Sequence, residues 1–295
     1  MKNLRNQLSF KLNKTSAIFL ILFCSILISF NGLAVRNINH ADALLINVYR
    51  SIALMTSISI FLLITTKKPL LRHVSAIGWP GIFGGVLMGC ANICFLQALT
   101  NTTVANALFT ISAIPFITAL LAFIFLKERI ELITISTMVF ASIGVYIMFS
   151  SGVDSGQMYG NIMALLTALV FSCFAIIVRK YRAVDMIPTL LLAGFISGLI
   201  GLVASFDNLA ISFHDLLLCF LLGGILSGIA NCGFIIASRY LVAAEVTLYM
   251  FIEFALGPIW VWFFANENIS AASLVGGLII MLSVATRSIF QLRRP

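Results

Sequence analysis

Runs of about twenty apolar residues recur along the whole chain, separated by short polar breaks. In a bilayer each such run forms a helix, because a helix satisfies all its backbone hydrogen bonds within itself. Of the 295 residues, 61% are hydrophobic and only 9% are charged, whereas soluble domains carry about 25% charged residues. No soluble core could bury that much apolar surface. The sequence therefore predicts an all-α integral membrane protein.

Ten apolar runs predict ten transmembrane helices. They lie near residues 15–35, 43–65, 76–99, 102–126, 131–150, 159–179, 188–206, 215–238, 241–265 and 270–290. The first run follows a basic segment, as in a signal peptide, but it is long, lacks a clear small-residue cleavage site and precedes many further spans. We interpret it as the first transmembrane helix.

The basic residues cluster in alternate connecting segments. With a cytoplasmic N-terminus, 16 of the 18 Lys and Arg residues fall on the cytoplasmic side, leaving Arg36 outside and Arg50 within a helix. The positive-inside rule then predicts that both termini are cytoplasmic. The net charge of +8 thus indicates membrane topology rather than a nucleic-acid partner.

The chain also repeats itself. Residues 84–98, GGVLMGCANICFLQA, match residues 223–237, GGILSGIANCGFIIA, at 8 of 15 positions with an offset of 139. The same offset relates Glu128 to Glu267, and an offset of 143 relates Arg36 to Arg179. Because each repeat holds an odd number of helices, five, the second copy must enter the membrane from the opposite side. Inverted repeats are typical of transporters, with the substrate site near the midplane between the halves.

This repeat gives the predicted organisation of the chain. Residues 1–14 form a cytoplasmic tail and residues 15–150 the first five-helix repeat. An external linker, residues 151–158, leads to the second five-helix repeat, residues 159–290, and residues 291–295 form a second cytoplasmic tail. Glycines at four-residue spacing occur in the third helix and again in the eighth, at Gly81, Gly85, Gly89, Gly224 and Gly228. They predict close packing, either as one seam between helices 3 and 8 or as a matched pair of seams.

Three stretches give the chain a family resemblance: Tyr49-Arg50, Pro115 followed by FITALLAFIFLKER, and EFALGPIWVWFFANEN from Glu253. With them, the whole chain resembles the drug/metabolite transporter superfamily, specifically ten-helix members built of two EamA-type repeats. The resemblance implies a secondary transporter, usually an exporter, of small metabolites, amino-acid-like or drug-like solutes in the plasma membrane, here a bacterial inner membrane. One departure is Phe254, which stands where the first half has Pro115. It leaves the position of the kink in helix 9 open.

Three charged residues fall inside predicted helices: Arg50, Glu245 and Glu253. Each costs about 2.5 to 3.5 kcal/mol at mid-bilayer, so each needs a partner, water or a neutral form. Glu245 and Glu253 are eight residues apart with Tyr249 midway, which places all three on one helical face. We expect that face to line a central cavity, with Tyr49 beside Arg50 as a further candidate.

Two interpretations of Arg50 and Glu253 stay open. They form a structural ion pair between helices 2 and 9, or Arg50 binds a substrate carboxylate or phosphate while Glu253 binds a substrate cation or a coupled proton. Glu245 either contributes to the site, or is hydrated near the helix start and offsets its partial positive charge. The repeat-related Asn92 and Asn231 either hold helices together or contact substrate.

Other polar and aromatic residues have simpler interpretations. Asn106 is equivalent to Glu245 and is a weaker candidate, while Trp260 and Trp262 are typical of an aromatic belt. We interpret Glu128 and Glu267 as boundary or packing signals. The six cysteines form no C-x-x-C pair and the three histidines are scattered, so no metal or cofactor is expected.

The chain lacks the G-x-x-x-x-G-K-[ST] motif of ATP-binding proteins, so a gradient or downhill flow would drive transport. Two other classes remain as alternatives: a membrane enzyme acting on a lipid-linked substrate, and a passive channel or facilitator. The first lacks candidate catalytic residues and the second lacks a continuous polar lining. The expected partners are a small-molecule substrate and the bilayer, with no nucleic acid, and the chain is expected as a monomer or a homodimer.

Overall fold

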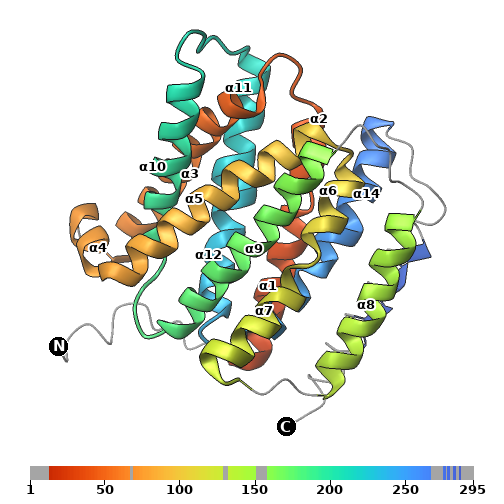
Figure 1. Cartoon of the computed structure of the whole chain (residues 1–295). Coiled ribbons are helices and arrows are strands. Elements are labelled where there is room, and N and C mark those ends of the chain that lie inside the picture. Colours follow the sequence, from red (N-terminus) through yellow and green to blue (C-terminus); the bar gives the residue numbers. More distant parts are fainter. Residues whose placement is uncertain are drawn as a thin grey trace.

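The described part of the chain is built from helices joined by short connections (Figure 1). The computed structural model describes residues 13–66, 69–128, 132–150, 158–266 and scattered positions between 275 and 286. Its helices are α1 Lys14–Ile28, α2 Asn31–Arg36, α3 Ala43–Thr66, α4 Leu70–Ala76, α5 Gly78–Asn101, α6 Val104–Ile111, α7 Ile114–Leu121, η2 Ala122–Leu126, α8 Leu132–Ser150, α9 Met158–Lys180, α10 Thr189–Ala204, α11 Phe213–Phe220, η3 Leu221–Ser227, α12 Gly228–Ala237, α13 Ala243–Tyr249 and α14 Phe251–Ala265.

Within the described residues, seven helical segments are long and apolar enough to cross a membrane. Two further segments, Ile135–Gly144 and Thr189–Ala204, are apolar but shorter. These nine segments coincide, within a few residues at each end, with the first nine predicted helices. The tenth predicted helix, 270–290, lies mostly outside the described residues, as does Glu267.

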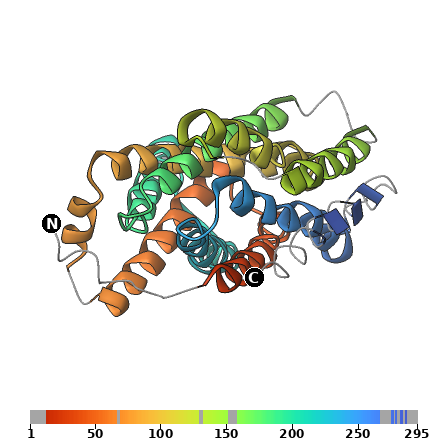
Figure 2. The same ribbon diagram turned by 90° about the horizontal axis from the view of Figure 1, so that it is seen from below.

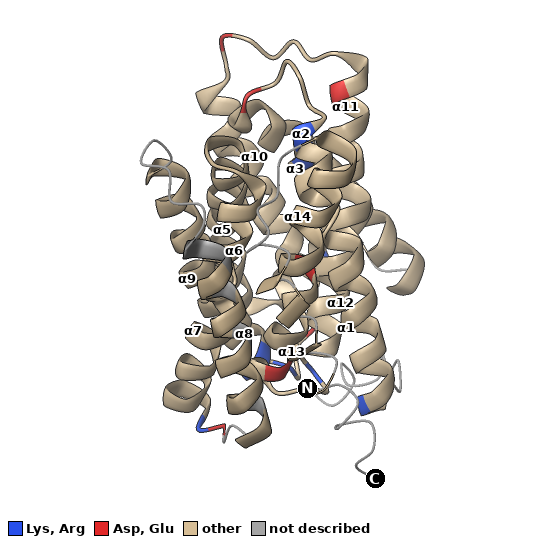
Figure 3. Cartoon of the chain, turned by 90° about the vertical axis from the view of Figure 1, so that its right-hand side faces the viewer, with Lys and Arg blue, Asp and Glu red and all other residues tan. Residues whose placement is uncertain are grey.

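The charged residues gather toward the two ends of the bundle, and few lie between them (Figure 3). We call the end where α1 begins and α9 ends the basic end. It carries Lys14, Arg72, Lys127, Arg179, Lys180, Arg182 and Arg239. The middle of the bundle is therefore apolar, as a bilayer requires.

The glycines form two separate seams rather than one. Gly85 of α5 packs against Leu192 of α10, whereas Gly224 lies near Ala53 of α3. The prediction of a single seam between helices 3 and 8 is thus wrong. The structure contains the alternative, a matched pair of seams. Predicted helix 3 (α5) packs on helix 7 (α10), and predicted helix 8 (α11, η3 and α12) packs on helix 2 (α3). Figure 2 shows α1, in red, beside the blue α13 and α14.

Several membrane-spanning segments are interrupted near mid-length. Breaks separate α1 from α2, α6 from α7 and α13 from α14, and η3 is a π-helical stretch between α11 and α12. Pro115 has no N–H to donate and is the second residue of α7, just after the break between α6 and α7. In helix 9 the break lies at Met250. There two backbone hydrogen bonds span three residues instead of four: the Met250 N–H donates to Thr247 O, and the Glu253 N–H donates to Met250 O. The kink in helix 9, whose position the sequence left open, therefore lies at Met250, even though residue 254 is a phenylalanine and not a proline.

Candidate functional site

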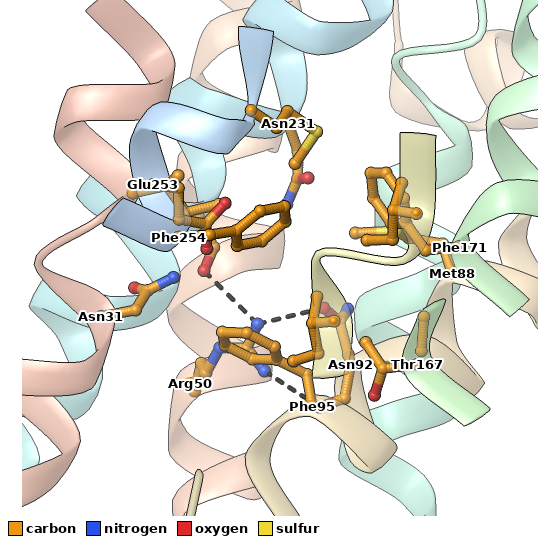
Figure 4. A pocket seen from close by; sticks show the side chains of 16 residues that line it. Asn31, Arg50, Met88, Asn92, Phe95, Thr167, Phe171, Asn231, Glu253 and Phe254 are labelled. Atoms are coloured by element: carbon orange, nitrogen blue, oxygen red, sulfur yellow. Dashed lines mark hydrogen bonds between the residues drawn. The ribbon is translucent and has the colours of Figure 1, made fainter. Parts of the chain in front are cut away.

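A cavity lies where the interrupted helices meet (Figure 4). The residues on its wall that flank the breaks or end the π-helix are Ile28, Asn31, Ile111, Ile114, Ser227, Met250, Glu253 and Phe254. The remaining wall residues come from α3, α5, α9 and α12, namely Arg50, Met88, Ala91, Asn92, Phe95, Thr167, Phe171 and Asn231. The cavity therefore draws on both halves of the chain.

The cavity is small, about 50 Å³, which is room for a few water molecules. Most of its wall is apolar, with aromatic rings from Phe95, Phe171 and Phe254. The conformation is therefore contracted around the site, and a metabolite would need the walls to move apart.

The Arg50 guanidinium is held from one side of the cavity. Its Nη2 lies 3.0 Å from Asn92 Oδ1 and 3.4 Å from Ser227 Oγ, and its Nη1 lies 3.4 Å from Asn47 Oδ1. All of these acceptors are neutral. Arg50 is 5% exposed, so a buried positive charge is fixed in orientation by hydrogen bonds but is not neutralised by them.

Glu253 lies on the same cavity wall and is 3% exposed. Within the described residues, its carboxyl makes no hydrogen bond and no ion pair, and none joins it to Arg50. The structural ion pair between helices 2 and 9 is therefore not formed in this conformation. A buried cation and a buried carboxyl face one cavity without a charged partner in the described part of the chain.

Two amides complete the polar lining. Asn31 is 2% exposed, and its Oδ1 is buried without a hydrogen-bond partner in the described part of the chain. Asn231 also lines the cavity, whereas its repeat-related Asn92 is engaged by Arg50. Figure 4 shows Arg50 and Asn92 on one side of the cavity and Glu253 and Asn231 on the other.

The other predicted site residues lie elsewhere. Glu245 lies at the basic end, where its Oε1 is 3.9 Å from Lys14 Nζ. Tyr249 is fully buried and outside the cavity lining. Tyr49 donates its hydroxyl to Leu209 O, 2.6 Å away, at the opposite end of the bundle. Of the three residues expected on one helical face, only Glu253 lines the cavity. Glu245 lies at the basic end, and the break at Met250 interrupts the regular helix between Tyr249 and Glu253.

The aromatic-belt interpretation of Trp260 needs correction. Trp260 does not simply face lipid: its Nε1 donates to Ser29 Oγ at 2.8 Å and its ring stacks on Phe30 at 4.7 Å. It thereby fixes helix 9 to the break in helix 1. Trp262 is 43% exposed, in keeping with a lipid-facing position. Asn106 is buried outside the cavity lining, at the start of α6.

Glu128 is more than a boundary signal. Its Oε1 lies 2.7 Å from Arg179 Nε, and its Oε2 accepts the Ala243 N–H at 3.1 Å. Arg179 also donates to Ser238 O at 3.0 Å. We call these four residues the basic-end latch. It joins the end of helix 4 in the first half to three helix ends of the second half.

Sequence reasoning missed Asn31 and Ser227 as cavity residues. Asn31 lies near the end of the first apolar run, where a polar residue is easily taken for a helix boundary. The signal for Ser227 was present in the repeat, because it stands beside the matched glycines and replaces the equivalent Met88. Among the described residues, no three His, Cys, Asp or Glu side chains are placed to hold a metal ion.

Comparison with known proteins gives one family match. Residues 15–150 match the EamA-like transporter family. The match confirms the family resemblance over these residues, and it indicates a membrane transporter of the drug/metabolite type. The search of curated proteins gave no match.

The fold of the whole chain is similar to a solved one. One crystal structure of a protein superposes on it with a TM-score of 0.77, over 96% of this chain and 100% of that chain. The sequence identity is 16%, so this likeness concerns the fold alone. The family match covers the first half of the chain, whereas the structural likeness covers nearly all of it.

Proposed function

We propose that the chain is a secondary transporter that moves a small zwitterionic solute by alternating access of two inverted five-helix halves. The observation that carries the proposal is the cavity itself. Interrupted helices supply its wall, and it holds a buried guanidinium and a buried carboxyl that do not pair with each other. Transporters commonly place substrate sites where discontinuous helices meet at mid-membrane.

The packing supports inverted repeats. In the two halves, helix 1 corresponds to helix 6, helix 3 to helix 8 and helix 4 to helix 9. Helix 1 packs on helices 8 and 9 of the second half, and helix 6 packs in the same way on helices 3 and 4 of the first half. The same offset of 139 relates the start of α6 at Val104 to that of α13 at Ala243. It also relates Lys127 to Asn266, the only two described non-glycine residues with positive φ. Two halves that can exchange conformations would open the cavity to one side and then to the other.

The charge pattern supports an orientation. The basic end would face the cytoplasm under the positive-inside rule, with both termini on that side. We base two further parts of the proposal on the resemblance to the drug/metabolite transporters. These are that transport runs outward from the cytoplasm, and that the protein lies in a bacterial inner membrane.

The cavity chemistry favours a neutral solute with separated charges. A substrate carboxylate at Arg50 and a substrate ammonium at Glu253 would satisfy both buried groups, whereas a singly charged solute would leave one of them uncompensated. The apolar and aromatic wall around them suits an apolar side chain. An amino-acid-like solute meets all three conditions. In the absence of such a cation, Glu253 would hold a proton, which offers a route to proton coupling.

The test is counterflow of labelled amino acids with apolar side chains into liposomes that contain the purified protein. Exchange driven by unlabelled solute on the far side would support a carrier, against both a channel and an enzyme. Arg50→Gln and Glu253→Gln are each expected to lower exchange roughly ten- to hundredfold, because each removes a charge-assisted bond worth about 1.5 to 3 kcal/mol.

Glu245→Gln is the matched control, since it removes a buried carboxyl on the same helix but outside the cavity. It should leave exchange close to that of the wild type. Arg50→Lys keeps the charge and guards against a loss caused by misfolding. Equal exchange by the wild type and Glu253→Gln would remove the assigned cation site, and unchanged substrate-dependent proton movement in that variant would remove proton coupling.

A further inference from the structure

A second hollow lies outside the substrate cavity, in the surface between α5, η2 and α9 near the basic end. Its volume is about 320 Å³, and its wall includes Trp79, Phe83, Phe125, Cys173, Lys180 and Tyr181. Trp79, Phe83 and Phe125 are 77%, 50% and 62% exposed. We call this hollow the basic-end groove. Because the helices are long and apolar enough to cross a bilayer and these rings are exposed, we infer that the groove opens toward lipid.

The groove has an apolar depth and a polar mouth. Phe83 and Cys173 lie on its wall within the spanning segments, and Phe125 lies near the end of η2. Lys180 ends α9 at the basic end, and Tyr181 follows it. An aromatic residue and a lysine at the same level are typical of the membrane interface, where the lysine stem packs on apolar groups and its ammonium reaches the head groups.

The Lys180 ammonium is available for an external anion. Its Nζ lies 5.9 Å from the centre of the Tyr181 ring, and it makes no ion pair with any described residue. The adjacent Arg179 is engaged with Glu128, so the carboxylate of the latch is already compensated. Lys180 is exposed at the end of α9, so its ammonium is accessible to an anion at the basic end.

We propose that the basic-end groove binds one acidic phospholipid, with an acyl chain along Phe83 and Phe125 and the phosphate at Lys180. Water in the groove would find few polar partners, whereas an acyl chain would fill it and cover its aromatic rings. Basic pockets between transmembrane helices favour acidic head groups for the same electrostatic reason. This inference does not depend on which solute the central cavity carries.

The experiment is native mass spectrometry of the detergent-purified protein titrated with phosphatidylglycerol and, separately, with phosphatidylcholine. The wild type should retain the acidic lipid more tightly. Lys180→Gln should weaken phosphatidylglycerol binding roughly fivefold, the effect of one basic residue at a membrane surface. It should weaken phosphatidylcholine binding less, because the choline cation offsets the phosphate charge. Arg72→Gln, which removes another exposed cation at the basic end but outside the groove, is the control and should bind as the wild type does.

A second variant tests the acyl-chain half of the site. Cys173→Trp fills the groove and should lower retention of both lipids. Unchanged phosphatidylglycerol binding in Lys180→Gln would overturn the proposal. So would displacement of the lipid by glycerol phosphate at equal concentration, because that result would assign the site to a free phosphate ester rather than to a lipid.

Discussion

Gly223→Ala is expected to remove most of the folded protein. A Cβ at this position would overlap the carbonyl oxygen of Arg50 and lie 2.8 Å from its carbonyl carbon. Both atoms belong to the backbone of α3, so no side-chain rotation can relieve the overlap. We expect a loss of at least about 3 kcal/mol in the free energy of unfolding. Thermal unfolding in detergent and the monodisperse fraction in size-exclusion chromatography would measure it.

Two neighbouring substitutions serve as controls. Gly224→Ala meets only ordinary contact, with its nearest neighbour, Ala53 O, at 3.6 Å. Gly84, which is equivalent to Gly223 in the first half, has Thr189 Cγ2 at 3.4 Å as its nearest neighbour. Both should cost far less than Gly223→Ala. Three equal losses would show that helix 8 can move away from α3, which would contradict the tight seam.

The same close approach positions the site. Because Gly223 lets η3 approach α3 at the Arg50 backbone, Ser227, one turn further along, comes within 3.4 Å of the Arg50 guanidinium. The absence of a side chain at Gly223 therefore supports the orientation of a buried charge as well as the packing of two helices.

The sequence predicted the parts of this fold that depend on hydrophobicity and repetition. Apolar runs located nine helices, because burial in lipid leaves few alternatives for such segments. Charge and amides within those runs pointed to Arg50, Glu253, Asn92 and Asn231, which all line the cavity. A polar group inside an apolar helix is costly unless it faces the interior, so this signal is physically strong.

What the sequence could not give is the register across a broken helix. A regular helix would align Glu245 with Glu253, but the bonds that span three residues at Met250 change the rotation between them. The sequence also could not predict that Arg50 and Glu253 do not pair. Arg50 is held instead by the neutral acceptors Asn92 and Ser227, which come from helices distant in the sequence. Such partners depend on the three-dimensional packing of both halves.

Arg179→Met is expected to destabilise the protein through the basic-end latch. The Arg179 and Glu128 side chains are 9% and 19% exposed, so the substitution leaves a largely buried carboxylate without its cation. Breaking a buried pair in this way typically costs about 3 to 5 kcal/mol. Thermal unfolding of Arg179→Met, Glu128→Gln and the double variant would measure it. The double variant should lose less than the sum of the two single losses, because the pair acts as a unit.

The pair between Arg239 and Asp185 provides the matched control at the same end of the bundle. Its atoms are 2.9 Å apart, but its side chains are 20% and 28% exposed. More water reaches it, so Arg239→Met should cost only about 1 kcal/mol or less. Since the latch joins the two halves, its loss should also expose the cavity. A cysteine placed at Asn231 should react faster with a water-soluble maleimide in the Arg179→Met background than in the Arg239→Met background. Equal rates, together with equal stabilities, would mean that Glu128 and Arg179 do not hold the halves together.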